Sequence, residues 1–256
     1  MAIQLSFHSY GHGEPLVILH GLLGSSDNWH TVSKKLSAHF LVFAVDLRNH
    51  GRSPHSDSFS YETMAQDIKE FLQQHSLSSV FLLGHSMGGK TAMTFALAHP
   101  DSVRKLIVVD IAPRHYGAQH DHIFDALYSL KLEQFQNRKQ IDETLARTIP
   151  SFSTRQFLMK NLSRNDAGSF TWKINLDVIH RNYGELNKAV QGGPPFTKPT
   201  LFIRGGKSPY ILDEDLGDIK RLFPFSTVTT IQHAGHWVHA DTPDEFTNIV
   251  LDFCSE

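Results

Sequence analysis

VFLLGHSMGGKT, at residues 80–91, fits two active-site motifs that overlap. The pattern G-x-S-x-G, centred on Ser86, is typical of a sharp strand-to-helix turn that exposes a nucleophilic serine. From Gly84 to Thr91 the chain also fits G-x-x-x-x-G-K-[ST], a loop in which backbone amides and Lys90 bind phosphates. The first motif predicts an acyl hydrolase, and the second predicts a nucleotidase.

The chain around this stretch alternates between two hydrophobic patterns, which predicts an α/β fold. Short apolar runs that suit buried parallel strands lie at 15–20, 40–46, 80–84, 105–111, 200–204 and 227–232. Helical patterns lie at 27–36, 61–74, 86–98, 213–222 and 244–253. An amphipathic run at 3–7 is expected to add an antiparallel edge strand. This order predicts an open, mostly parallel sheet with right-handed crossovers, flanked by helices.

The alternation breaks between Pro113 and Pro199, where apolar residues recur at helical spacing. These residues are Ile123, Leu127, Leu130, Leu132, Phe135, Ile141, Leu145 and Ile149. The spacing predicts a helical cap, 113–196, inserted into a core formed by 1–112 and 197–256. The turn sequence GGPP at the end of the cap returns the chain to the sheet.

Composition narrows the class of protein. The chain has 256 residues and a net charge of -2, which gives no electrostatic reason to expect nucleic acid or an anionic membrane as a partner. Its single cysteine, Cys254, excludes an intrachain disulfide and a cysteine metal cluster. We see no signal peptide and no apolar stretch approaching the roughly 20 residues of a membrane span. A cytoplasmic protein is therefore expected.

The other parts of an acyl hydrolase lie on either side of the opening stretch. The motif GHW follows the last predicted strand, where open α/β sheets place their chemistry, so its His236 is the candidate base for Ser86. The motif HGLLG follows another central strand and can aim the Leu22 amide, alongside that of Met87, at a developing oxyanion. A phosphate-binding loop explains neither motif, which disfavours the nucleotidase.

With HGLLG, DLRNHGRS, GHSMGG and GHW in this order, the chain resembles the α/β-hydrolase superfamily over nearly its full length. GHSMGGK, VVDIAPRHY, GGKSPY and GHWVHA are most similar to the YbfF-type bacterial esterases and their mitochondrial abhydrolase relatives. The resemblance implies a serine esterase with a catalytic triad, an oxyanion hole and a cap. The cap is the part that matches least.

The acid of the triad is the part of the site that departs from the usual pattern of the superfamily. An aspartate is usual in the turn after the penultimate strand, but that turn is GGKSP here and carries Ser208 instead. Asp213 and Asp215 lie further along, where a helix is predicted to start. We favour Asp110, which ends the strand that follows the Ser86 turn, the nucleophile elbow. It lies 110 - 86 = 24 residues beyond Ser86. The YbfF-type esterases are similar in this respect, and Ser208 is then expected to hydrogen-bond to the acid or the histidine.

These features predict a cofactor-independent serine hydrolase that cleaves a small-molecule carboxylic ester or a thioester through an acyl-enzyme. The resemblance suggests acyl-CoA as one substrate class. Trp237 and Leu23 are predicted to line the substrate pocket. Carbon-carbon hydrolysis, perhydrolysis, hydroxynitrile cleavage and a non-catalytic ligand receptor remain alternatives on this fold.

Several further polar residues receive structural interpretations. His85 is expected to support the elbow, and Lys90 is expected to be an ordinary helix residue. The histidines His115, His120 and His122 follow Asp110, but their spacing does not form a compact metal-binding motif. No metal and no cofactor are therefore expected, and the sequence does not determine the oligomeric state.

Overall fold

The computed structural model describes residues 1–255, in which seven strands form one sheet. In chain order the strands are β1 (Phe7–Tyr10), β2 (Glu14–Leu19), β3 (Phe40–Val45), β4 (Val80–His85), β5 (Val103–Val109), β8 (Thr200–Gly205) and β9 (Ser226–Ile231). Their spatial order is β1-β3-β2-β4-β5-β8-β9, and only β1 is antiparallel to its neighbour. The predicted α/β fold with a mostly parallel sheet is confirmed, with strand ends shifted by one or two residues.

The predicted first strand was placed too early in the chain. We expected it at 3–7, whereas β1 pairs with β3 from Phe7 onward. The preceding residues bond to side chains instead: the Ile3 amide donates to Asp67 Oδ1 at 2.8 Å and the Ser6 amide to Ser53 Oγ at 2.8 Å. These two side-chain acceptors, which are distant in the chain, occupy backbone amides that a longer strand would use for pairing.

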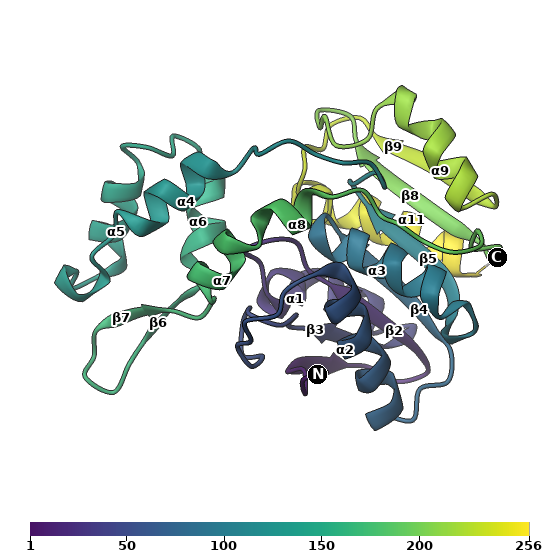
Figure 1. Ribbon diagram of the computed structural model, residues 1–256, viewed down its shortest axis with the longest axis horizontal. Helices are drawn as coiled ribbons and strands as arrows, with labels where there is room; N and C mark the ends of the chain where they lie inside the picture. The colour runs from purple at the N-terminus through teal and green to yellow at the C-terminus, as the bar shows by residue number, and fades with distance from the viewer. Residues whose placement is uncertain (256) are drawn as a thin grey trace.

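Helices cover both faces of the sheet (Figure 1). They are α1 (His30–Leu36), α2 (Tyr61–Gln74), α3 (Met87–Ala98), α9 (Leu216–Leu222) and α11 (Pro243–Ser255). Alternate residues of β2 show the arrangement: Val17 and Leu19 pack in the core that α2 and α3 share, while Leu16 and Ile18 pack in the core that includes α1 and α11. Because both faces are buried, the central strands are continuous apolar runs.

Two of the predicted helices begin with a short 3-10 turn. The pattern at 27–36 forms Ser26–Trp29 and then α1, and the pattern at 213–222 forms Asp213–Asp215 and then α9. The helix predicted at 61–74 has the bounds of α2, because Ser60 caps its N-terminus by accepting a hydrogen bond from the Thr63 amide. Among the described residues, no helix combines the length and apolarity that crossing a bilayer requires.

The segment between β5 and β8 forms a separate lobe to one side of the sheet (Figure 1). It contains α4 (Asp121–Tyr128), α5 (Arg138–Leu145), α6 (Phe152–Met159), β6 (Leu162–Arg164), β7 (Phe170–Trp172), α7 (Leu176–Arg181) and α8 (Tyr183–Asn187). The hairpin of β6 and β7 was not expected. It turns at Gly168, whose φ of 79° is accessible to glycine, and the helical spacing does not reveal such a turn.

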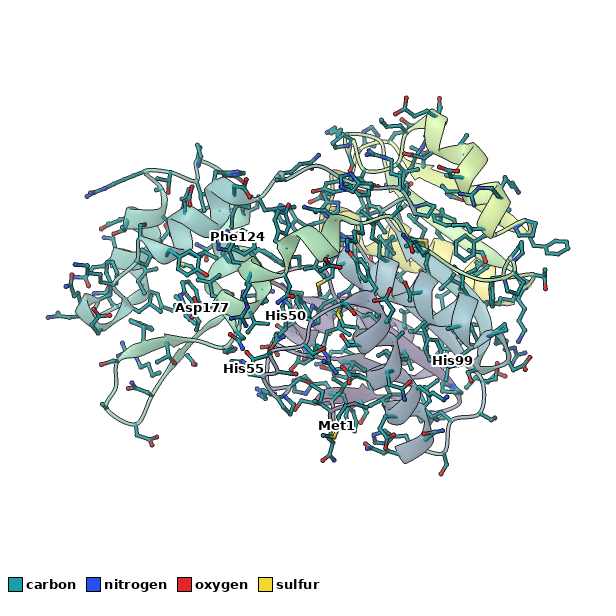
Figure 2. All side chains as sticks on the ribbon, in the orientation of Figure 1. Met1, His50, His55, His99, Phe124 and Asp177 are labelled. Carbon is teal, nitrogen blue, oxygen red and sulfur yellow. The ribbon has the colours of Figure 1, made fainter. Side chains whose placement is uncertain are left out.

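The loop after β3 joins the sheet to this lobe, and Figure 2 shows His50 and His55 near their junction. The Asn175 amide donates to the Asn49 carbonyl at 2.9 Å, and His55 Nε2 donates to the Lys173 carbonyl at 3.0 Å. The loop after β3 therefore connects the edge of the sheet to the lobe through hydrogen bonds.

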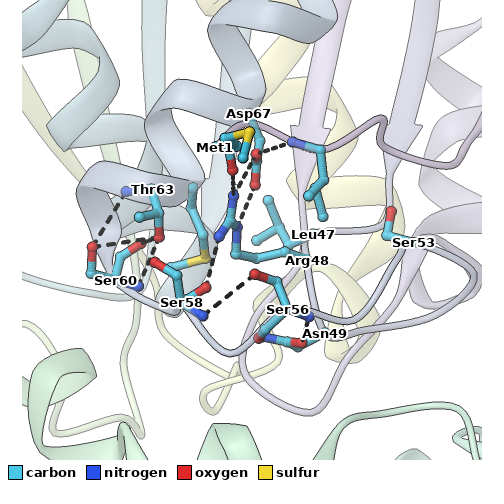
Figure 3. Close-up of polar contacts among 12 residues, drawn as sticks. Met1, Leu47, Arg48, Asn49, Ser53, Ser56, Ser58, Ser60, Thr63 and Asp67 are labelled. Atoms are coloured by element: carbon cyan, nitrogen blue, oxygen red, sulfur yellow. Dashed lines mark hydrogen bonds and ion pairs between the residues drawn. The ribbon is translucent and has the colours of Figure 1, made fainter.

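A buried ion pair fixes this loop to α2 (Figure 3). Arg48 donates to both carboxylate oxygens of Asp67, at 2.6 and 2.7 Å, and neither side chain is exposed. Arg48 also donates to the Ser58 carbonyl at 2.7 Å. A bidentate pair with additional hydrogen bonds is the arrangement in which a buried charge is tolerated.

We predict that Asp67→Asn lowers the free energy of unfolding by about 3 to 5 kcal/mol, because it leaves the Arg48 guanidinium buried without a counter-charge. Urea unfolding followed by circular dichroism measures the change. Asp57→Asn is the matched control, since Asp57 pairs with Arg181 on the surface and its side chain is 95% exposed. Equal stability of the two variants would contradict the prediction.

Candidate active site

Ser86 occupies a strained turn between β4 and α3. Its φ is 53°, a value that few residues other than glycine adopt, and its amide donates to the Val109 carbonyl at 3.0 Å. The flanking glycines are required by close packing, because a Cβ on Gly88 would lie 2.4 Å from the Leu19 carbonyl oxygen. The stretch therefore adopts the geometry of a nucleophile elbow.

Asp110 lies at the end of β5 with its carboxylate fully buried and accepts hydrogen bonds from three donors. His236 Nδ1 donates to Oδ2 at 2.7 Å, and the Ser208 hydroxyl donates to the same oxygen. The Gly205 amide donates to Oδ1 at 2.9 Å. The carboxylate thus holds His236 with Nδ1 protonated and leaves Nε2 free to accept a proton.

The two later aspartates lie against arginines instead of the histidine. Asp213 pairs with Arg204 at 2.7 Å, and Asp215 pairs with Arg114 at 2.9 Å. The structure therefore brings Asp110 to His236, and it brings neither of the alternatives there.

His236 is supported by two residues that the sequence did not single out for this role. The Tyr210 ring stacks on the imidazole with ring centroids 4.0 Å apart. His85 Nε2 donates to the His236 carbonyl at 2.8 Å, which ties the elbow to the loop that carries the histidine. Burial holds the pKa of His85 well below its usual value, so this ring is neutral. Tyr210 belongs to the GGKSPY motif, the only sequence signal for it.

Ser86 and His236 face one cavity of about 350 Å³, but no hydrogen bond joins their side chains in the described chain. The hydrogen bond between a nucleophile and its base is often loose before substrate binds and tightens in the complex. The cavity is lined by Ser86, by other residues at the sheet edge and by residues of the inserted lobe. The lining residues include Leu22, Leu23, Ile123, Ile149, Phe157, Leu158, Tyr210 and Trp237.

The turn at 20–24 is held from three sides. His20 Nε2 accepts from the Leu47 amide at 3.0 Å, and His50 Nε2 accepts from the Leu23 amide at 3.2 Å. Asn161, from the lobe, donates to the Leu23 carbonyl at 2.7 Å. The amide of Leu22, next to this fixed residue, donates to no acceptor within residues 1–255.

Met87 begins α3, and its amide likewise has no acceptor in the described residues. The first amides of a helix have no partners inside the helix. Leu22 and Met87 both line the space beside Ser86. They are therefore placed where free donors can stabilise an oxyanion.

The two predicted pocket residues lie on the cavity wall. Trp237 packs against Phe157 of α6 with ring centroids 5.3 Å apart, and Leu23 is a buried residue of the same lining. Of the three histidines after Asp110, His120 hydrogen-bonds to the Tyr183 hydroxyl at 2.6 Å and His122 reaches the cavity lining. Phe157, from the inserted lobe, also lines the cavity.

The chain matches the alpha/beta hydrolase fold family over residues 14–243, and it belongs to that family. It is 40% identical to the sn-1-specific diacylglycerol lipase ABHD11 of Xenopus laevis, covering 98% of this chain and 84% of that protein. It is 34% identical to Esterase YbfF of Escherichia coli, covering 96% and 94% respectively. The predicted resemblance is confirmed.

The solved structure of a marine microorganism esterase superimposes with a TM-score of 0.97 at 45% sequence identity, covering 98% of this chain and all of that one. Esterases and lipases thus occur among the sequence relatives, and an esterase occurs among the structural neighbours. The protein is a carboxylic ester hydrolase of the α/β-hydrolase fold.

We predict that Asp110→Asn lowers kcat on the order of 10⁴-fold, because an amide cannot hold His236 in the required tautomer or stabilise its protonated form. Asp213→Asn is the control and should change kcat less than twofold. Steady-state hydrolysis of a chromogenic ester measures both. The reverse pattern would assign the acid to Asp213.

Proposed function

We propose that this esterase is a serine hydrolase that forms an acyl-enzyme on Ser86. The observation that carries the proposal is the Asp110–His236 hydrogen bond at the edge of a cavity that also exposes Ser86. In this mechanism Ser86 Oγ attacks the ester carbonyl while its proton passes to His236 Nε2. The Leu22 and Met87 amides then stabilise the oxyanion.

The second half of the reaction uses the same groups. His236 gives its proton to the leaving alcohol as the carbon-oxygen bond breaks, and a water then attacks the acyl-enzyme while His236 removes its proton. Asp110 keeps the imidazole oriented and compensates its positive charge. Ser208 is a positioning residue in this proposal, because its hydroxyl contacts Asp110 and lines no part of the main cavity.

We predict that Ser86→Ala abolishes hydrolysis while the melting temperature stays close to that of the wild type, because only the nucleophile is removed. A fluorophosphonate should label the wild type at one site per chain and leave the variant unlabelled, as mass spectrometry would show. A non-catalytic receptor would not react in this way. Unchanged turnover in Ser86→Ala would overturn the proposed mechanism.

We further propose that 113–196 acts as a cap that shapes the substrate pocket. Hydrogen bonds join the two ends of this segment: the Val190 amide donates to the Pro113 carbonyl at 2.7 Å, and the Tyr116 amide to the Asn187 carbonyl at 2.8 Å. These contacts support the boundary at 113 and a return of the chain from the lobe near residue 190. Phe157 brings the lobe into contact with Trp237, beside the candidate base.

We predict that Phe157→Ala lowers kcat/KM for octyl acetate about tenfold and changes that for ethyl acetate less than twofold. Loss of apolar contact worth about 1.4 kcal/mol accounts for a factor of ten. The matched control is Phe152→Ala on the same helix, where the side chain is largely exposed. Equal losses with both esters would argue against a pocket formed by the cap.

Thioesters, including acyl-CoA, are a further proposed substrate class. Attack by Ser86 requires only an acyl carbonyl and the two oxyanion donors, and a thiolate leaves more readily than an alkoxide. Hydrolysis of acetyl-CoA by the wild type but not by Ser86→Ala would support this extension. Activity confined to oxygen esters would restrict the function to esterase.

A further inference from the structure

A second, smaller chamber lies beside Ser86. Its volume is about 40 Å³, which leaves room for a group of only a few heavy atoms. Both spaces are lined by Ser86 and Leu22, so they meet at the nucleophile. Met87 and Lys90 line only the small chamber, whereas His236 and Trp237 line only the large cavity.

Lys90 brings a buried amine to the wall of this chamber. The residue is 1% exposed, and it makes no ion pair within residues 1–255. Its Nζ donates to the carbonyl of Lys188 at 2.6 Å and, at 3.4 Å, to that of Asn187. An ammonium has three donors, so one N–H has no acceptor among the residues that the structure describes. Lys90 lies in α3 as expected, but the sequence did not predict that its side chain is buried beside Ser86.

The aromatic groups around Lys90 do not supply a counter-charge. The rings of Tyr116 and Tyr61 lie 4.7 and 5.7 Å from Nζ. Their hydroxyls donate elsewhere, Tyr116 to the Tyr210 carbonyl at 2.5 Å and Tyr61 to the Leu186 carbonyl at 2.6 Å. Arg114 lies on the same Tyr116 ring, with Cζ 4.1 Å from the centroid, and adds positive charge nearby.

The environment therefore penalises the ammonium. Burial first, and the Arg114 charge second, lower the pKa of Lys90 to about 7. Burial also lowers the pKa of His120, the other basic group in the chamber wall, to about 4, so it is neutral near pH 7. A carboxylate that entered the chamber would compensate Lys90, accept its free N–H and raise its pKa again.

The position of His236 indicates which part of an ester enters the chamber. In the proposed mechanism His236 must protonate the leaving alcohol, so the alcohol has to lie on the side of Ser86 that His236 faces. That side is the large cavity. The acyl group then extends toward Met87 and Lys90, into the small chamber.

We infer that the Lys90 chamber is an acyl subsite that binds a carboxylate carried by the acyl group, so that half-esters of short dicarboxylic acids are preferred substrates. This inference rests on the proposed function. Lys90 is a specificity-determining residue in it, since its N–H contacts the substrate away from the reacting bond.

The test compares kcat/KM for monobutyl succinate with that for butyl 4-methylpentanoate, which has the same leaving group and an acyl group of the same shape without the charge. Release of butanol is measured for both. We expect the wild type to prefer the succinate half-ester at least tenfold, and Lys90→Met to lose this preference through a lower kcat/KM for the half-ester.

Lys188→Met is the matched control, because its amine pairs with Glu185 on the surface while its backbone carbonyl still accepts from Lys90. This variant should keep the preference. The same ratio in Lys90→Met and the wild type would overturn the inference. So would a wild type that favours the neutral ester.

A measurement on the wild type alone covers the case in which Lys90→Met does not fold. Succinate should inhibit hydrolysis of the neutral ester competitively and at least tenfold more strongly than 4-methylpentanoate does. The preference for the half-ester should also fall as the pH rises through 7, because Lys90 then loses its proton in the free enzyme. Equal inhibition by the two acids would count against the subsite.

Fluorophosphonate labelling separates this inference from the function on which it rests. A protein whose Ser86 is labelled and essential, but which shows no preference that depends on Lys90, retains the proposed function and loses only the subsite. A protein that remains active as Ser86→Ala loses both.

Discussion

The buried carboxylate of Asp110 is the group on which the arrangement of the site depends. A charge with no exposure to solvent is stable in a protein only when donors surround it. Here the donors come from separate parts of the chain: the Gly205 amide at the end of β8, the Ser208 hydroxyl in the next turn, and the His236 ring after β9. One carboxylate therefore fixes the relative positions of two loops and orients the imidazole toward the cavity.

The parallel sheet explains why these groups meet at one edge. Neighbouring parallel strands all end on the same side, so the turns after β2, β4, β5 and β8 lie next to one another. The elbow follows β4, Asp110 follows β5, and the Leu22 turn follows β2. The inserted lobe also leaves the sheet after β5, and for that reason it covers the same edge and contributes walls to the cavity.

Two buried cations, Arg48 and Lys90, differ in how the free-energy cost of burying a charge is compensated. Arg48 is neutralised by a bidentate pair with Asp67, which anchors the loop between β3 and α2. Lys90 makes no ion pair within residues 1–255 and donates to backbone carbonyls, and burial, followed by the nearby charge of Arg114, lowers its pKa. A buried charge with a partner stabilises the fold, whereas one without a partner is free to interact with a ligand.

Much of this protein was predictable from sequence because the relevant signals are local. Strands and helices follow from hydrophobic periodicity, which predicted the helix at 61–74 with the bounds that α2 has. Ser86 and His236 were identified by glycine-containing motifs at strand ends, and Asp110 by its place at the end of the next strand. The position of β1 and the β6-β7 hairpin were missed, because side-chain acceptors and a single glycine turn decided them.

The sequence by itself determined the fold class and which residues are candidates for chemistry, since these depend on patterns within a few residues. Only the tertiary structure decided which partners those residues have. Asp110, rather than Asp213, reaches His236 because β5 and β8 are adjacent in space, and Lys90 is buried beside Ser86 because the end of α8 packs over α3. Burial and partner geometry depend on contacts between distant segments, so no local pattern in the chain encodes them.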